Sequence, residues 1–268
     1  MSGRSRLFCS VLIMILITWL LEYTVAAKPE KRTLNIQLQP VHKDTPVFSF
    51  SNNTKPGSSY PIRLIKIRDN PLFKSLPDIE ANTLYYGEVK LGSPARTHGI
   101  LIDFEGKEKL LWADSDADHN FAGEIGYRIF KSDRVPGTNY YYSPTPISFQ
   151  VAFDFEGRRF ESLIQFNLPF FEIARTSYQD YFSLITRTWF TGNIRIGETE
   201  LRVGVVDTNN NGIYRDSNDL LMIDRDYDLN FTLKESSVLA KTKTIKLLSE
   251  RWNVSYDFLP EKLILTER

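Results

Sequence analysis

The chain lacks the residues on which disulfides and most thiol chemistry depend. It has a single cysteine, Cys9, in 268 residues. Cys9 lies inside an apolar N-terminal run that we expect to be removed, so the remaining chain has no thiol. This excludes disulfides, thiol catalysis and cysteine-ligated zinc. An exported chain of this kind must be stabilised by its core or by bound ions.

The chain also has no excess of positive or of negative charge. Lys and Arg number 33, Asp and Glu number 33, and the formal net charge is zero. Nucleic acid and anionic membrane surfaces attract proteins with a clear excess of basic side chains. The composition therefore gives no reason to expect either as a partner.

Recognised catalytic motifs are absent as well. The chain has no His-Glu-x-x-His zinc motif, no Gly-x-Ser-x-Gly elbow, no phosphate-binding Walker loop and no dinucleotide fingerprint. Of its three histidines, His42 and His98 lie in surroundings that indicate turns. His119 lies in an acidic segment, where we expect a solvent-facing side chain in preference to a metal ligand. The sequence therefore does not reveal a reaction.

Residues 1–27 have the three parts of an export signal. Arg4 and Arg6 precede an apolar run over residues 7–21, and small residues follow at 25–27. The run is shorter than the roughly 20 residues that a membrane-spanning helix requires. We predict cleavage after Ala27 and export to the periplasm, the cell surface or the medium, with an uncleaved anchor as the alternative. No other segment is apolar enough to be expected to cross a membrane.

From residue 61 onward the hydrophobic pattern is typical of strands and turns. Segments 62–67, 84–91 and 147–155 alternate apolar and polar residues and are rich in Ile, Val, Tyr and Phe. A turn at 156–158 leads into another alternating run at 159–166, which predicts a hairpin. Residues 28–60 are polar with a short alternating run at 34–38, and we interpret them as an extended lead-in that contributes an edge strand. The pattern predicts an all-β, sandwich-like fold over residues 61–268.

Two segments of the chain resemble each other. Residues 110–121 and 220–231 share the pattern Leu-Leu-x-x-Asp-x-Asp-x-Asp-x-Asn-Phe, with seven of twelve positions identical. A similar strand precedes each, at 87–92 and 192–197, and an apolar stretch ending in Asp103 or Asp207 follows it. We interpret the chain as a degenerate duplication with units at about 84–130 and 189–235.

Acidic residues at alternate positions predict three calcium-binding loops. Calcium prefers six to eight oxygen ligands, and such loops supply carboxylates at positions 1, 3 and 5 and near position 12. The candidate ligands are Asp114, Asp116, Asp118, Asn120 and Glu124 in the first loop, Asp224, Asp226, Asp228, Asn230 and Glu235 in the second, and Asp207, Asn209, Asn211, Asp216 and Asp219 in the third. Carboxylates this close repel one another unless a cation compensates, and this number of them favours calcium over magnesium.

These loops resemble the Asp-x-Asp-x-Asp calcium loops of EF-hand and dockerin proteins over about a dozen residues each. The resemblance implies calcium as the ligand and does not extend to the fold, because no flanking helices are expected. His119 and Leu229 stand where those loops have glycine. The alternative interpretation is that the Asp and Asn residues are turn formers that bond their own backbone between strands.

The leading functional hypothesis is an exported calcium-binding β-protein that acts as a binding or structural module. Its expected partners are calcium and either a carbohydrate or another exported protein, and the tyrosines at 140–142 could stack against a sugar. The alternative is a secreted carbohydrate-active or peptide-cleaving enzyme that uses scattered carboxylates. The candidates for that chemistry are Asp154, Glu156, Glu161, Glu172 and Asp180.

Overall fold

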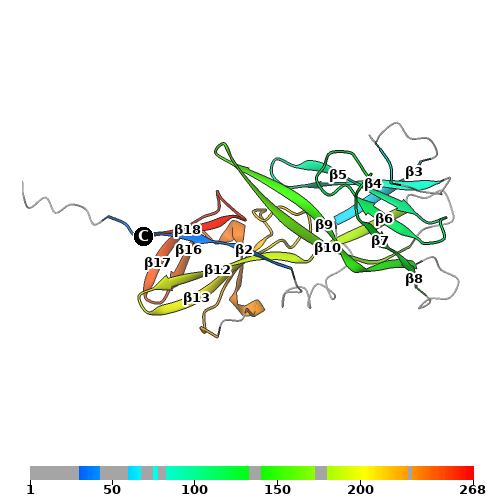
Figure 1. The fold of residues 1–268 in the computed structure, drawn as a ribbon. Helices are drawn as coiled ribbons and strands as arrows, with labels where there is room; N and C mark the ends of the chain where they lie inside the picture. Colours follow the sequence, from blue (N-terminus) through cyan, green and yellow to red (C-terminus); the bar gives the residue numbers. More distant parts are fainter. Residues whose placement is uncertain are drawn as a thin grey trace, which may run out of the picture.

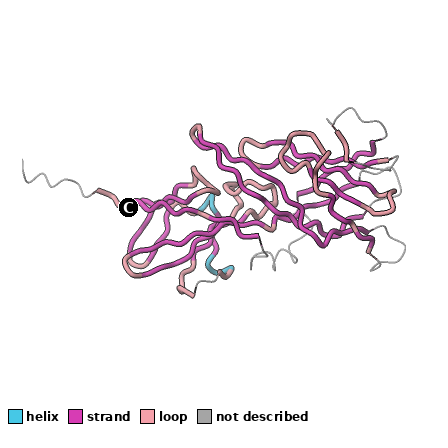
Figure 2. The backbone as a smooth tube through the Cα atoms, in the orientation of Figure 1, coloured by secondary structure: helices cyan, strands magenta, loops and turns pink. Residues whose placement is uncertain are grey.

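The computed structural model describes residues 30–42, 60–67, 75–77, 83–132, 140–172, 180–228 and 231–268. The predicted export signal and part of the predicted lead-in lie outside these residues. The described chain consists almost entirely of strands, which confirms the predicted all-β class (Figure 2). Its helical segments are two 3-10 helices, η1 (Leu233–Glu235) and η2 (Leu239–Lys241). No helix among the described residues has the length and hydropathy required to cross a bilayer.

The strands form three sheets, and every pairing between named strands is antiparallel. The largest sheet has nine strands and lies at one end of the molecule (Figure 1). Its order is β7 (Gly126–Arg128), β6 (Leu110–Ala113), β5 (Arg96–Asp103), β4 (Leu84–Leu91), β3 (Tyr60–Ile67), β11 (Asp180–Thr186), β10 (Arg158–Glu172), β9 (Tyr140–Phe155) and β8 (Phe130–Lys131). Strands β7 and β8 hold opposite ends of this order, yet only Ile129 separates them in the chain, so the sheet curls round to bring its two edges together.

The other two sheets lie toward the opposite end of the molecule (Figure 1). The five-stranded sheet has the order β15 (Ser236–Val238), β14 (Leu220–Ile223), β13 (Thr199–Val206), β12 (Thr188–Ile196) and β2 (Gln39–His42). The four-stranded sheet has the order β1 (Thr33–Gln37), β18 (Lys262–Glu267), β17 (Glu250–Ser255) and β16 (Thr244–Leu247). The described part of the lead-in therefore supplies an edge strand to each of these two sheets.

A single large hydrophobic cluster connects the three sheets. The hairpin of β9 and β10, which turns at Glu156 and Gly157 as the sequence predicts, carries its aromatic residues into this cluster. Phe153 lies 6.4 Å from Tyr214, and Phe155 lies 5.9 Å from Phe258, measured between ring centroids. Apolar residues alternate along this long hairpin, so most of them lie on one of its faces. This face packs against Tyr214 and Phe258, which follow much later in the chain.

Two smaller clusters lie beneath the first and second acidic loops. Phe121, at the end of the first repeated segment, is buried with Leu84, Leu101 and Trp112. Phe231, at the end of the second, is buried with residues of β12, β13 and β14, namely Trp189, Val206 and Met222. Each loop is therefore anchored at its far end by a phenylalanine that packs against the sheet from which the loop emerges.

Candidate functional site

Each acidic loop starts with a fully buried aspartate at the end of an inner strand. Asp114 follows β6, Asp207 follows β13 and Asp224 follows β14, and all three have no exposed surface. The backbone N–H of Asp114 donates to the carbonyl of Gly99 (2.9 Å), and that of Asp224 donates to the carbonyl of Arg202 (3.0 Å). The sheet ladder thus continues into the first residue of both loops and fixes where the loops begin.

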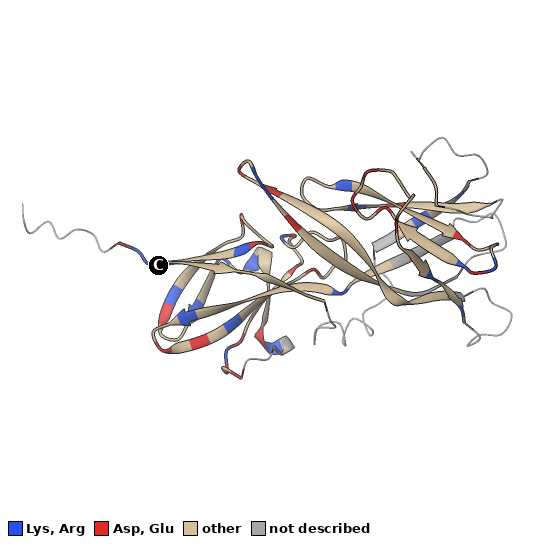
Figure 3. Ribbon diagram, viewed as in Figure 1, with Lys and Arg blue, Asp and Glu red and all other residues tan. Residues whose placement is uncertain are grey.

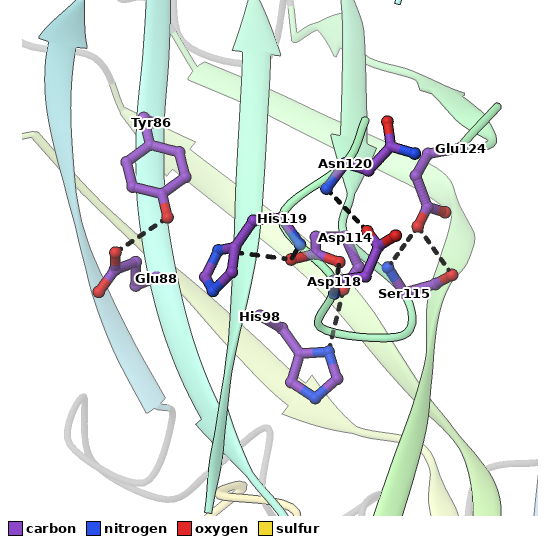
Figure 4. A network of polar contacts seen from close by, with 9 residues as sticks. All are labelled: Tyr86, Glu88, His98, Asp114, Ser115, Asp118, His119, Asn120 and Glu124. Atoms are coloured by element: carbon purple, nitrogen blue, oxygen red, sulfur yellow. Dashed lines mark hydrogen bonds and ion pairs between the residues drawn. The ribbon is translucent and has the colours of Figure 1, made fainter. Parts of the chain in front are cut away.

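The first loop wraps around the carboxylate of Asp114 (Figure 4). Asp114 Oδ1 accepts a hydrogen bond from the backbone N–H of Asp118 (3.0 Å), and Oδ2 accepts one from that of His119 (3.1 Å). Asp118 Oδ1 in turn accepts from the N–H of Asn120 (2.7 Å). Ala117 and His119 have φ values of 61° and 60°, so His119 adopts the left-handed conformation that glycine has in the loops it resembles.

The carboxylates of the first loop gather around one point. Asp114, Asp116 and Asp118 each offer an oxygen, and these oxygens lie within 4.8 Å of one another. Glu124 does not belong to this group. Its Oε1 accepts hydrogen bonds from the backbone N–H (2.7 Å) and the hydroxyl (3.0 Å) of Ser115, and burial raises the pKa of its carboxyl despite these bonds. Glu124 therefore closes the loop by binding its second residue.

Two histidines lie beside the first loop (Figure 4). His98 is buried within strand β5, so the expectation that it lies in a turn is wrong. The same expectation is wrong for His42, which is remote from this loop and lies in strand β2. His98 Nδ1 is 2.9 Å from the carbonyl oxygen of Asp114, so this nitrogen must donate, and burial lowers the pKa of the ring. His119 Nδ1 lies 4.0 Å from Asp114 Oδ2 with 48% of the side chain exposed, which is too far for a hydrogen bond.

The second loop gathers a different set of carboxylates. Asp224, Asp226 and Glu235 each place an oxygen within 4.8 Å of the other two. Glu235 Oε1 also accepts from the backbone N–H of Arg225 (2.7 Å), and Oε2 accepts from the N–H and hydroxyl of Thr232 (both 2.9 Å). Burial alone would raise the pKa of Glu235, but these hydrogen bonds lower it below its usual value. Asp228 is exposed, and Asn230 lies outside the described residues.

The third loop buries both of its end carboxylates. Asp207 Oδ1 accepts from the N–H of Asn210 (2.7 Å), and Oδ2 accepts from the N–H of Gly212 (2.8 Å) and the hydroxyl of Thr186 (2.9 Å). Burial raises the pKa of Asp207 to about 6. Burial and the neighbouring charge of Asp207 raise the pKa of Asp219 to about 8. Buried carboxylates with raised pKa values are costly to ionise unless a positive charge accompanies them.

The remaining candidate ligands of the third loop converge on Asp216. Its Oδ2 accepts hydrogen bonds from the side-chain amides of Asn209 (3.0 Å) and Asn211 (2.5 Å). Asn209 and Asn211 also accept through Oδ1 from backbone N–H groups two residues further along. The backbone N–H of Asp216 donates to Asp219 Oδ2 (2.7 Å), so Asn209, Asn211, Asp216 and Asp219 form one network. In this network side-chain amides donate to the carboxylate that a cation would otherwise contact.

The three loops share one backbone geometry. In each, the N–H of the second residue donates to the closing carboxylate, at 2.7 Å for Ser115 to Glu124, 3.1 Å for Thr208 to Asp219 and 2.7 Å for Arg225 to Glu235. In each, the fourth residue has a positive φ, with 61° at Ala117, 61° at Asn210 and 65° at Tyr227. Ordinary turns between strands do not require a hydrogen bond to a carboxylate about ten residues away. The bond from the second residue to the last carboxylate therefore favours one compact loop around its carboxylates over a series of independent turns.

The donor set is suited to a hard cation. The first and second groups consist of carboxylate oxygens, which calcium prefers, and neither includes the sulfur or paired imidazole ligands typical of zinc or copper. Three backbone N–H groups and the hydroxyl of Ser115 already hold Asp114 and Glu124 in place by hydrogen bonds, which reduces the ordering that binding would require. The arrangement can therefore hold a metal ion at two places among the described residues.

The carboxylates proposed for an enzyme lie in different surroundings. Asp154, Glu156 and Glu161 are exposed around the β9–β10 turn, and Glu161 pairs with Arg159 at 2.5 Å. The side chains of Glu172 and Asp180 lie outside the described residues. Solvated carboxylates at a hairpin end are typical of a surface turn, so no observation here favours hydrolysis.

Several residues of the loops were not predicted from the sequence. Thr186 donates to Asp207, 21 residues further along the chain, and His98 contacts the carbonyl of Asp114, 16 residues further along, so both contacts link separate strands. The contacts between the second residue of a loop and its closing carboxylate could have been predicted from the sequence. Ser115 and Thr208 are small polar residues that directly follow the first aspartate of their loops.

Comparison of the chain with protein-family models, with curated protein sequences and with solved structures found no match.

Proposed function

We propose that the chain is an exported, calcium-stabilised β-protein that acts as a binding or structural module outside the cell. The observation that carries this proposal is the gathering of three carboxylates within 4.8 Å at two separate loops of matching backbone geometry. Uncompensated carboxylates at this spacing repel one another, and a cation that binds only the folded chain would stabilise it by mass action. Export rests on Arg4, Arg6 and the apolar run at 7–21.

The test is a thermal melt of the purified protein in a chelator and then in millimolar calcium. At a calcium concentration of 100 times Kd we expect about 2.7 kcal/mol of stabilisation per site, which for a chain of this size raises Tm by roughly 5 to 10 °C. Asp116→Ala and Asp226→Ala should each reduce the rise, because both side chains are exposed members of the two groups. Asp154→Ala and Asp257→Ala, at exposed carboxylates outside the loops, are the matched controls.

A melting temperature that does not respond to calcium would contradict the metal site. Magnesium in place of calcium should give a smaller rise, because it retains its water and tolerates fewer carboxylates. Export is tested separately: the mass of the protein recovered outside the cell should correspond to a chain that starts at residue 28, and retention inside the cell would contradict that part of the proposal.

We further infer that the two units descend from a duplication. Support comes from strand register, because Gly87 pairs with Ile100 as Gly192 pairs with Val203, and Asp103 pairs with Leu110 as Val206 pairs with Leu220. This register aligns Asp103 with Val206, so Asp207 lies one residue beyond the position that the sequence comparison gave it. A transplant of residues 224–235 in place of 114–124 tests equivalence. The chimera should fold and keep its calcium response, whereas aggregation would contradict the inference.

A further inference from the structure

A pocket with a basic lining lies where the two edges of the nine-stranded sheet meet. Its volume is about 340 Å³, and its lining comes from the loop before β6, from the end of β7 and from β8. The lining residues are Lys107, Glu108, Lys109, Arg128, Ile129, Phe130 and Lys131. The N–H of Ile129 donates to the carbonyl of Lys109 (2.9 Å), which extends the pairing of β6 with β7 by one step into the lining of the pocket.

The charge of this lining is strongly one-sided. Four of the seven residues are cationic and one, Glu108, is anionic, which leaves a local charge of +3. Along the rest of the ribbon, basic and acidic residues both occur (Figure 3). Glu108 pairs with Arg128 at 2.8 Å, so the three lysines have no acidic partner among the lining residues. An anion that enters the pocket meets an excess of positive charge.

One aromatic ring accompanies these cations. Phe130 lines the pocket with 42% of its surface exposed, whereas most of the described phenylalanines are buried. Its ring stands 5.9 Å from that of Tyr142 at an interplanar angle of 35°, so the neighbouring strand β9 supports it. Such an exposed, supported ring can bind the apolar face of a sugar.

We propose that this pocket binds an acidic oligosaccharide, with its carboxylate or sulfate groups against Lys107, Lys109 and Lys131 and a sugar ring against Phe130. The volume is at the lower end of the range for small-molecule sites, about 300 to 1,000 Å³, and suits a few sugar rings. A folded polyanion such as duplex nucleic acid needs a longer basic stripe. The inference rests on the proposed function in one respect, because an exported module encounters acidic saccharides outside the cell.

The test is calorimetric titration of the purified protein in a chelator with trigalacturonate, with a heparin-derived disaccharide, with maltotriose as the neutral saccharide and with a mononucleotide. At least one acidic saccharide should bind, and maltotriose should not. A preference between the two acidic probes identifies carboxylate or sulfate as the recognised group, and either preference supports the proposal. The chelator separates this result from the calcium response, so failure of one proposal is distinguishable from failure of the other.

Variants locate the binding. Lys107→Ala with Lys109→Ala should weaken binding about tenfold or more, since each removes an ion pair to the ligand. Phe130→Ala should weaken it severalfold. The matched controls, Lys241→Ala with Lys246→Ala and the exposed Leu248→Ala, should leave it unchanged, and the melting temperature of each variant checks that it folds. The proposal is overturned if neither acidic saccharide binds at millimolar concentration, if maltotriose or the nucleotide binds as tightly, or if the pocket variants bind like the controls.

Discussion

The first and second loops begin alike and close differently. Asp114 and Asp224 are both buried at the end of an inner strand, and in both loops the second residue donates its N–H to a glutamate. In the second loop that glutamate, Glu235, also joins the acidic group, whereas in the first loop Glu124 remains outside it and Asp118 joins instead. Glu124 is at position 11 of its loop and Glu235 is at position 12. With this difference of one residue, the first glutamate only closes its loop, whereas the second can also bind a cation.

This difference extends to the charge of the two glutamates. Burial raises the pKa of Glu124, although Ser115 donates two hydrogen bonds to it. Glu235 is also penalised by burial, but its hydrogen bonds from Arg225 and Thr232 prevail and lower its pKa. The second loop is therefore built to keep its closing glutamate ionised, which is the form that a cation requires.

One large effect that we expect concerns the residues at which the loops are alike. Asp114→Ala leaves the backbone N–H groups of Asp118 and His119 without their acceptor. Two partly buried donors without partners cost about 2 kcal/mol of unfolding free energy in total. Chemical denaturation in a chelator measures this loss. Asp224→Ala in the same assay extends the comparison to the second loop, and a loss of less than half that of Asp114→Ala would break the equivalence of the two loops.

Asp116→Ala is the matched control for that substitution. Asp116 is exposed, so in the chelator its replacement should change the free energy of unfolding by less than about 0.5 kcal/mol. A loss as large as that of Asp114→Ala would mean that the hydrogen bonds to Asp114 are not what determines the stability of the loop.

The third loop provides a contrast in pH dependence. Asp207 and Asp219 have pKa values of about 6 and about 8, above the usual 3.8, because they are buried. The folded chain therefore holds more protons than the unfolded chain between about pH 4 and pH 8. Its stability in a chelator should fall as pH rises through this window, by up to about 1.4 kcal/mol per pH unit for each group.

Melts in a chelator at pH 5, 6.5 and 8 measure this fall. Asp219→Asn should remove its upper part, because the amide cannot ionise. The same substitution at the exposed Asp257 should leave the pH profile unchanged. A melting temperature that rises from pH 5 to pH 8, or a profile that Asp219→Asn does not alter, contradicts the account of the third loop.

A smaller effect concerns the closing glutamates. Glu235→Gln should remove about 1 to 2 kcal/mol of the stabilisation that calcium provides, because the glutamate belongs to the group of carboxylates. Glu124→Gln preserves the shape of the acceptor and should change the calcium response by less than about 0.5 kcal/mol. Calcium titrations followed by Tm compare the two. Equal losses would show that the difference in spacing has no effect on binding.

Much of the loop geometry could be predicted from the sequence because it is local. The closing carboxylates lie within 13 positions of the first aspartate in every loop, so spacing alone brings Glu124, Asp219 and Glu235 into reach. The all-β class likewise follows from alternation along single strands. Contacts such as that of Thr186 with Asp207 depend on the order in which the strands pair. No local sequence pattern specifies this order.

The same limit applies to the basic pocket and to the sheet order. Lys109 and Arg128 become neighbours only because β6 pairs with β7 and the sheet curls round. In the printed sequence they are isolated charges among many of both signs. Sequence reasoning therefore found the acidic loops, where candidate ligands follow one another, and missed the pocket, where strand pairing assembles them.

The smallest effect concerns the residue that replaces a glycine. His119 and Gly212 both occupy the sixth position of their loops, with φ values of 60° and 71°. A non-glycine residue in this conformation costs about 1 kcal/mol, so His119→Gly should stabilise the protein by roughly 0.5 to 1 kcal/mol. The reverse change, Gly212→Ala, places a Cβ 2.9 Å from Leu91 Cδ2 and should destabilise it. Urea denaturation in calcium measures both. If His119→Gly destabilises the protein, then the imidazole contributes to the first loop by contact with Asp114, and the two loops differ at their turn as well as at their closing carboxylate.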